Sequence, residues 1–260
     1  RKILEEHHDA RVLCITHSET STGALTDVEA IGTLTCEHKA LLVVDAITSI
    51  GVHPVHMDGW GVDLMACGSQ KGCMIPPGLA FIAASPRAWE VIESNDSPRY
   101  YLDMVKMRDK WESGTTTPFT AAVSLTRALK KALDMMFEEG LEKLHNRHAR
   151  LAEATRTAMT ALGMELVAED PVNGVTAVHA PDGIDTKEMT QKMRDAYGIS
   201  IAGGQAHMKG KIFRVGHMGY VSEEDLLMVI SAIERALKDL GYEFDFGAGV
   251  AAAHRSLFGE

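Results

Sequence analysis

The sequence has few cysteines, no excess of basic residues and no long apolar run, and each absence narrows the class of protein. Its 26 Lys and Arg are outnumbered by 36 Asp and Glu, so the net charge is −10 and no nucleic-acid partner is expected. No stretch approaches the roughly 18 apolar residues of a membrane span. The four cysteines form no CxxC pair, which is typical of reduced thiols in a cytoplasmic protein. They are Cys14, Cys36, Cys67 and Cys73.

The N-terminal region carries no recognisable targeting segment. Residues 1–10 are charged and helix-like, unlike a signal peptide, which agrees with a cytoplasmic location. The chain opens without a methionine and, by its pattern, within a helix. We therefore expect a piece of a longer protein.

The first part of the chain alternates apolar runs with polar clusters, which is the pattern of an α/β fold. Four apolar runs predict strands, at residues 11–16, 40–44, 62–67 and 79–84. The first two are typical of buried parallel strands, and residues 26–39 between them predict a connecting helix. A strand, a helix and a second strand form a crossover unit, so we predict a mainly parallel sheet.

A long helical stretch follows and divides the chain. Residues 120–162 are helical in pattern almost throughout, with Gly140 as the expected break. Such a stretch can act as a spine between two domains. We expect a partial large domain at residues 1–135 and a smaller C-terminal α+β domain at residues 136–260.

The last hundred residues alternate strands and helices. The strand-like segments are residues 174–180 and 211–215, and the helical ones are residues 185–197 and 222–240. Ser222 precedes three acidic residues, which is a helix-start pattern. Residues 246–260 are rich in Ala and Gly, which predicts a loose tail.

Polar side chains follow three of the predicted strands. The clusters are residues 16–23 (THSETSTG), 45–49 (DAITS) and 68–71 (GSQK). In open α/β sheets ligands bind beyond the carboxyl ends of the strands. Lys71 alone would be read as a solvated surface group, and Asp45 alone as a turn residue. Together they supply the amine and the carboxylate that pyridoxal phosphate chemistry requires, and the loops supply hydroxyl groups for its phosphate.

The segments THSETSTGAL, LLVVDAITSIG and GSQKGCMIPPGLAFIA, in this order and at these intervals, resemble the class V aminotransferases. The likeness is greatest to the alanine-glyoxylate and serine-glyoxylate aminotransferase group. It extends to YYLDM, GTTTP and FRVGHMG, and so covers nearly the whole chain. It implies a fold-type-I transferase that depends on pyridoxal 5'-phosphate.

The resemblance assigns cofactor roles to four positions in these segments. It makes Lys71 the Schiff-base lysine and the proton shuttle between substrate and cofactor. Asp45 becomes the partner of the pyridine nitrogen. Thr20 and Gln70 occupy positions that in the family lie against the ring hydroxyl or the phosphate.

Two further positions follow from the same resemblance. Thr116 stands where the family reaches across a dimer interface to the partner's phosphate, so a homodimer is expected. Arg214 stands where the family binds the substrate carboxylate, a task that suits a guanidinium group. The alternative for Arg214 is a strand residue that points to solvent.

The implied activity moves an amino group from alanine or serine to glyoxylate or pyruvate, with ping-pong kinetics. A phosphonate or phosphoserine aminotransferase, or another class V enzyme, is one alternative. A truncated or non-catalytic homologue is the other, because family members are longer. In those members the part corresponding to what precedes Arg1 supplies a phosphate loop and an aromatic ring that stacks on the cofactor.

Twelve histidines raise the possibility of a metal site, but their spacing does not favour one. Two close pairs stand out, His53 with His56 and His145 with His148, and neither has the further ligands of an HExxH site. We therefore predict no metal. His17 lies in the first polar cluster, where a loop-ordering hydrogen bond and a catalytic role are both open.

Overall fold

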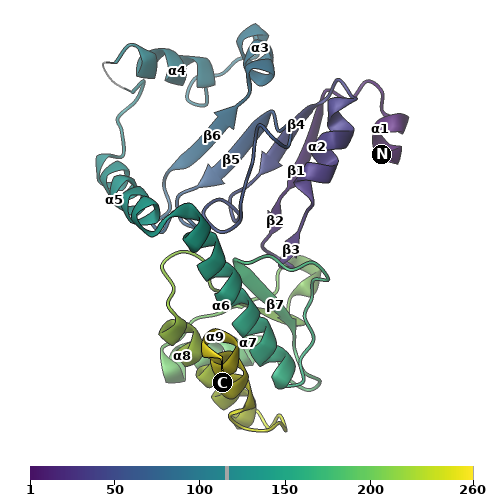
Figure 1. Cartoon of the computed structure of the whole chain (residues 1–260), viewed down its shortest axis with the longest axis vertical. Coiled ribbons are helices and arrows are strands. Elements are labelled where there is room, and N and C mark those ends of the chain that lie inside the picture. Colours follow the sequence, from purple (N-terminus) through teal and green to yellow (C-terminus); the bar gives the residue numbers. More distant parts are fainter. Residues whose placement is uncertain (115–116, 260) are drawn as a thin grey trace.

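The computed structural model describes residues 1–114 and 117–259. It has two halves that are joined by the long helix α6 (Leu141–Ala161), as Figure 1 shows. The half that contains the N-terminus is built on a four-stranded sheet, and the other half on a three-stranded sheet. In the described ranges, no helix is long and apolar enough to cross a membrane.

The first sheet confirms the predicted α/β class. Its strand order is β1-β4-β5-β6, with the first three strands parallel. The strands are β1 (Val12–Thr16), β4 (Leu41–Asp45), β5 (Leu64–Gly68) and β6 (Ala80–Ala84). β6 is antiparallel to β5, because a connection this short returns the chain directly and leaves no room for a parallel crossover. The expectation that the first strand is buried is wrong in part, since β1 is an edge strand whose Val12 is 49% exposed.

Helix α2 (Val28–Cys36) covers one face of this sheet, as predicted from the crossover pattern. Its N-cap Asp27 accepts a hydrogen bond from the backbone of Ala30. Gly32 allows the helix to touch the following loop, because a Cβ there would lie 1.8 Å from the carbonyl oxygen of Trp60. The apolar residues between helix and sheet form one core cluster, which comprises Val28, Leu42, Val44, Ala46, Val62 and Met65. The helix-like segment at the N-terminus is shorter than expected and forms α1 (Lys2–Glu6).

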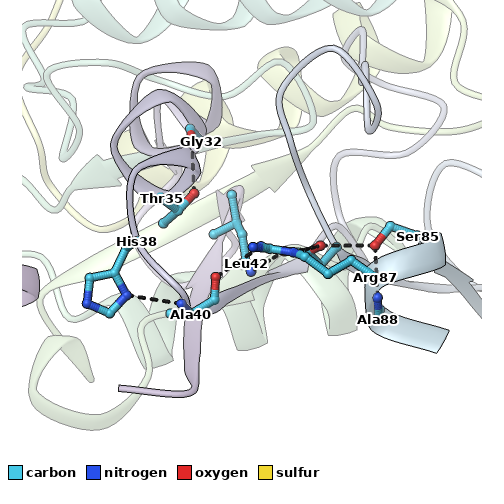
Figure 2. A network of polar contacts seen from close by, with 9 residues as sticks. Gly32, Thr35, His38, Ala40, Leu42, Ser85, Arg87 and Ala88 are labelled. Atoms are coloured by element: carbon cyan, nitrogen blue, oxygen red, sulfur yellow. Dashed lines mark hydrogen bonds and ion pairs between the residues drawn. The ribbon is translucent and has the colours of Figure 1, made fainter. Parts of the chain in front are cut away.

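A buried carboxylate ties three parts of the first half together. Asp63, just before β5, accepts hydrogen bonds from Leu42 N (2.8 Å), Ser85 Oγ (3.0 Å) and Arg87 Nε (2.9 Å). Arg87 also donates through Nη2 to the second Asp63 oxygen and to the carbonyl of Ala40. Figure 2 shows the side chain of Arg87 extending toward Ala40 and Leu42 at the start of β4.

Two helices after β6 were not predicted from the sequence, α3 (Pro86–Ser94) and α4 (Met104–Glu112). Both begin at ordinary capping residues: Ser85 with Pro at the first helical position, and Asp103, which accepts from Lys106 N. α4 has no buried residue and α3 has one. α4 therefore has no core-facing stripe, so there was little apolar period to detect in it.

The predicted helical stretch is confirmed as two helices, α5 (Val123–Glu139) and α6. They meet at Gly140, whose φ of 88° lies in the left-handed region that favours glycine. On α6 the side chains of Leu144, His148 and Leu151 are buried on one face. The predicted break and the predicted face are therefore both present, although Leu141 is exposed.

The second sheet is antiparallel and has the strand order β7-β9-β8. Its strands are β7 (Val175–His179), β8 (Ala202–Gly203) and β9 (Ile212–Gly216). The helices around it are α7 (Thr186–Tyr197), the short η1 (Ala206–Met208) and α8 (Glu223–Asp239). Ser222 and Asp225 form a capping box at the start of α8. A small hairpin of β2 (Ser18–Glu19) and β3 (Ala24–Leu25) lies between the two sheets.

The prediction of a loose tail at residues 246–260 is wrong. Most of this segment forms α9 (Ala248–Phe258), which packs against α6 and α8. Buried Glu234 of α8 accepts hydrogen bonds from Gly247 N (2.9 Å) and Val250 N (3.0 Å), which satisfies two donors at the start of α9. The Gly and Ala residues that indicated a tail are the small side chains that let α9 approach its neighbours closely.

Candidate functional site

The carboxyl ends of β1, β4 and β5 lie side by side and point toward the second half of the molecule (Figure 1). Thr16 pairs with Asp45, the last residue of β4, and Asp45 pairs with Ala66 of β5. Lys71 follows the end of β5 by three residues. The predicted carboxylate and the predicted amine therefore belong to neighbouring strand ends.

The side chain of Asp45 is half-buried, and one of its oxygens is already bonded. Oδ1 accepts a hydrogen bond from Ile47 N at 2.9 Å, which closes a turn directly after the strand. Within the described ranges, Oδ2 accepts no hydrogen bond. One carboxylate oxygen is thus left for a ligand.

The loop that carries Lys71 rests directly on the turn after β4. A Cβ on Gly72 would lie 2.0 Å from the carbonyl oxygen of Ile50, and one on Gly51 would lie 3.1 Å from the carbonyl oxygen of Gly72. Only glycine permits such an approach. Ser69 closes the base of the loop, because its hydroxyl donates to Pro76 O (2.9 Å) and accepts from Leu79 N (3.2 Å).

Thr20 contacts the turn after β4, and Gln70 lies at the neighbouring end of β5. The hydroxyl of Thr20 donates to that of Thr48 (3.2 Å), which in turn donates to Ser18 O (2.7 Å). The amide oxygen of Gln70 lies over the end of β5, since a Cβ on Gly68 would be 2.9 Å from it. Thr20 therefore lies close to the segment that follows Asp45, and Gln70 lies over the adjacent strand end.

Arg214 does not point to solvent, and the alternative for this residue is wrong. It is buried on β9, where Nε donates to Gly203 O (3.0 Å) and Nη1 to Thr20 O (2.8 Å). Burial lowers the pKa of Arg214, and the nearby Glu19 carboxylate acts in the opposite direction. Nη2 forms no hydrogen bond with the described residues, so part of the guanidinium remains for an anion. The bond to Thr20 brings the second half of the chain to the loop after β1.

His17 lies on the other side of its strand end, toward α2. Its ring centroid is 5.5 Å from that of Trp60 and 6.0 Å from that of His53. Burial lowers the pKa of His17, and Nδ1 is buried without a partner among the described residues. Its backbone N–H donates to Asp45 O (2.9 Å), so the main chain of this residue contacts the site while the ring packs elsewhere.

The remaining sequence predictions concern Thr116 and the histidine pairs. Thr116 lies outside the described residues. Within residues 1–114 and 117–259, no group of three or more His, Cys, Asp or Glu side chains is arranged to hold a metal ion. The rings of His148 and His53 are both buried. Each accepts a hydrogen bond from a backbone N–H group, that of Gly219 for His148 and that of Asn173 for His53.

Several residues that build the site were not identified from the sequence. Thr48 lies within the polar cluster at residues 45–49, but nothing in one sequence indicates that it contacts Thr20 across 28 residues. Gly51 and Gly72 were given no role in the sequence analysis. The signal that could have found them is the spacing of glycines on both sides of Lys71 and after Asp45, which is typical of close backbone contact.

Comparison with known proteins identifies the family. The Aminotransferase class-V profile matches residues 2–228, and the chain belongs to this family. A relative from Synechococcus sp. (strain PCC 6716), named soluble hydrogenase small subunit, is 48% identical over 99% of this chain and 68% of its own length. The serine–glyoxylate aminotransferase of Arabidopsis thaliana is 40% identical over 97% of this chain and 64% of its own length.

A solved structure supports the same assignment of the fold. The pyridoxamine-pyruvate aminotransferase from Mesorhizobium loti superposes with a TM-score of 0.94 at 32% identity, over 98% of this chain and 67% of that one. The predicted fold-type-I transferase is thereby confirmed. The chain spans about two thirds of the length of each of these relatives.

The family and its solved members imply pyridoxal phosphate as the cofactor. The side chains at the strand ends fit this group chemically: an amine on Lys71, a carboxylate oxygen on Asp45 without a bond to the described residues, and polar groups on Thr20 and Gln70. Ser18 adds a buried hydroxyl that has no partner within the described ranges.

Proposed function

We propose that this chain is the lysine-bearing part of a pyridoxal-phosphate-dependent aminotransferase. One observation carries the proposal: Asp45 and Lys71 stand at adjacent strand ends, and Arg214 is bonded to the loop of Thr20 at the same edge. The family membership supports it independently.

Each side chain has a defined task in this proposal. Pyridoxal phosphate, when bound, supplies the electron sink that stabilises negative charge on the substrate α-carbon. Asp45 would hold the ring nitrogen in its protonated form. Lys71 Nζ would anchor the cofactor and would act as the base that removes the proton from the substrate α-carbon. Arg214 Nη2 binds the substrate carboxylate and so presents the α-carbon to Lys71.

Small amino acids and 2-oxo acids are the proposed substrates. The Arabidopsis relative is named for serine and glyoxylate, and the Mesorhizobium structure for pyridoxamine and pyruvate. We propose alanine or serine as the amino donor and glyoxylate or pyruvate as the acceptor. Because the donor product leaves before the acceptor binds, double-reciprocal plots at several acceptor concentrations should be parallel.

Titration with the cofactor tests the proposal. The purified chain is mixed with pyridoxal phosphate and its near-ultraviolet and visible absorption is recorded, together with that of Lys71→Ala and of Lys209→Ala. Lys209 is an exposed lysine outside the site and serves as the matched control. A band that requires Lys71, persists in the control and bleaches with alanine or serine supports the proposal, and its absence in the wild type refutes it.

The same preparation separates the alternatives. A non-catalytic homologue would show no bleaching with any donor. A phosphonate or phosphoserine aminotransferase would bleach with a phosphorylated donor but not with alanine or serine. The name of the Synechococcus relative suggests a further assay, hydrogen-dependent reduction of a dye, and activity there would assign a different role to the chain.

We also propose that residues 1–135 are a cofactor-binding domain and residues 136–260 a smaller domain. Two separate apolar clusters support this division, since one holds only residues before the long helices and the other only residues from Leu151 onward. A cytoplasmic location remains part of the proposal. Fractionation of cells that produce the protein would test it.

A homodimer is proposed as the active form. Three large apolar side chains in the segment from Tyr100 to Trp111 are mostly exposed: Tyr100, Leu102 and Trp111 are 74%, 85% and 78% exposed. Patches of this kind mark association surfaces on soluble proteins. Thr116 comes shortly after Trp111 in the sequence. A residue that contacts the partner's cofactor is expected near such an association surface.

Mixing two inactive variants tests the shared site. If Thr116 serves the partner's cofactor, Lys71→Ala and Thr116→Ala chains combine into hybrid dimers with one intact site each. Random exchange of subunits then restores about a quarter of the wild-type activity. No recovery on mixing, in chains that do exchange, would contradict a site built from two subunits.

A further inference from the structure

Two consecutive side chains of helix α6, Arg147 and His148, bond the backbone carbonyl and the backbone N–H of one residue, Gly219. His148 Nε2 accepts a hydrogen bond from Gly219 N at 3.0 Å. Arg147 Nη1 donates to Gly219 O at 3.0 Å and to Val221 O at 3.3 Å, while its Nε is paired with Glu139. The turn that contains Gly219 is therefore fixed to the helix from both sides.

The ring of His148 is set for this contact. Nδ1 lies 2.8 Å from Leu144 O, and a carbonyl only accepts, so Nδ1 carries the proton and Nε2 is the acceptor. The side chain is completely buried. Burial is also the main reason that the pKa of His148 falls to about 4, which keeps the ring in the neutral form that can accept from Gly219.

The opposite side of Gly219 touches the loop of Lys71. A Cβ on Gly219 would lie 3.4 Å from both Lys71 O and Met74 Cγ, and its φ of +83° is a conformation that favours glycine. Met74 itself has a φ of 61° and donates its N–H to Lys71 O at 3.0 Å. A non-glycine residue in this region is strained and stays there only when its surroundings hold it.

The glycine turn also continues the strand that carries Arg214. Gly219 follows Arg214 by five residues, just beyond β9. The turn therefore lies between the residue proposed to bind the substrate carboxylate and the loop proposed to carry the reactive amine. A displacement of the turn would alter the relation between the two.

We propose that His148 is a positioning residue for Lys71: by holding the Gly219 turn, it sets the backbone against which the lysine loop packs. The inference rests on the proposed function for its catalytic meaning, but the mechanical link can be tested without cofactor. His148 touches neither substrate nor reacting atoms and acts through Gly219.

Three variants separate this role from general stability. His148→Leu removes the acceptor, and His148→Gln restores one, because the amide oxygen can occupy the place of Nε2. Thr155→Val is the matched control, since Thr155 is equally buried on the same helix and, among the residues that the structure describes, its hydroxyl bonds only to Leu151 O. Hydrogen exchange is followed in the cofactor-free chain, in peptides that contain the Met74 and Ile75 amides.

The expected result is local. His148→Leu should raise the exchange rate at residues 69–75 by about tenfold, as expected for the loss of one buried hydrogen bond. His148→Gln and Thr155→Val should leave it near the wild-type rate. Equal exchange at residues 69–75 in His148→Leu and in Thr155→Val would overturn the proposal. If His148→Leu does not fold, Arg147→Met must give the same local rise, and an unchanged rate there overturns it equally.

Absorption of the bound cofactor tests whether the position of the Lys71 loop affects cofactor binding. In the wild type, the Lys71-dependent band should appear at lower cofactor concentration than in His148→Leu, by about tenfold, with His148→Gln close to the wild type. Equal cofactor affinity in wild type and His148→Leu would overturn the link to Lys71. If the wild type shows no such band, the proposed function fails, while the exchange experiment still decides whether His148 positions the loop.

Discussion

Asp63→Asn should destabilise the first half of the protein while leaving the cofactor site intact. Asp63 precedes the first residue of β5, whereas Lys71 follows the last, so the two lie beyond opposite ends of the strand. The carboxylate accepts from Leu42, Ser85 and Arg87 and is almost fully buried. Asparagine has the same shape but carries no charge, and its NH2 group would face a donor.

The expected loss follows from the bonds that change. A hydrogen bond to a charged group contributes about 1.5–3 kcal/mol. Asparagine can still accept from Leu42 but loses the paired contact with Arg87, whose side chain is 45% exposed and so recovers part of its hydration. We expect a net loss of about 3 kcal/mol. For a chain of this size that corresponds to a fall in melting temperature of roughly 6–12 °C.

The pH dependence gives a second signature. Burial alone would raise the pKa of Asp63, but the hydrogen bonds from Arg87, Leu42 and Ser85 outweigh it, so the pKa lies below its usual value. The contribution of the charge is therefore present above about pH 4 and lost as the pH falls through the lower folded value. Asp63→Asn should lack this acid-dependent loss.

Thermal unfolding of the wild type, Asp63→Asn, Arg87→Met and the double variant measures the coupling. The two single losses should not add, because both remove the same pair. Additive losses, or a loss below about 1 kcal/mol for Asp63→Asn, would refute the reasoning. So would a variant that melts like the wild type but no longer binds cofactor.

Three further outcomes are expected. Burial lowers the pKa of His53 and His148 to about 4 and that of His217 to about 3, so stability should be full above about pH 6.5 and fall below it, by up to about 1.4 kcal/mol per pH unit for each ring, in denaturant titrations. Gly32→Ala places a Cβ 1.8 Å from a carbonyl oxygen and should leave little soluble protein, whereas Gly216→Ala, where a Cβ meets open space, should not. Glu234→Gln should cost about 1–2 kcal/mol and raise hydrogen exchange in α9 before other helices.

The strands and long helices were predictable because their apolar residues recur with a clear period. Residues 40–44 were predicted as a strand and overlap β4 in all but the first residue, and the predicted break at Gly140 is where the two long helices meet. The errors at α4 and α9 share one cause. α4 has no buried face and α9 consists largely of small residues, so in both cases the helix depends on neighbours that a single sequence does not reveal.

The residues at the strand ends of the site were predictable, but the contacts that join the two halves of the molecule were not. The polar clusters after the strands located Asp45 and Lys71 at one edge, since parallel strands present their carboxyl ends together. The contacts that join the two halves could not be foreseen. The bond from Arg214 to Thr20 spans 194 residues and that from His148 to Gly219 spans 71, and neither partner's backbone atom has any sequence signature.

The packing of α9 on α6 has a consequence for biosynthesis. The core of the second half includes residues from both helices, and Arg150 bonds the carbonyl of Leu257 across 107 residues of sequence. On the ribosome, at about 5–20 residues per second, α6 would therefore wait roughly 5–20 s for this partner to be made. During that interval the apolar face of α6 is exposed and can bind chaperones. Nascent chains stalled before α9 should therefore stay bound to chaperones.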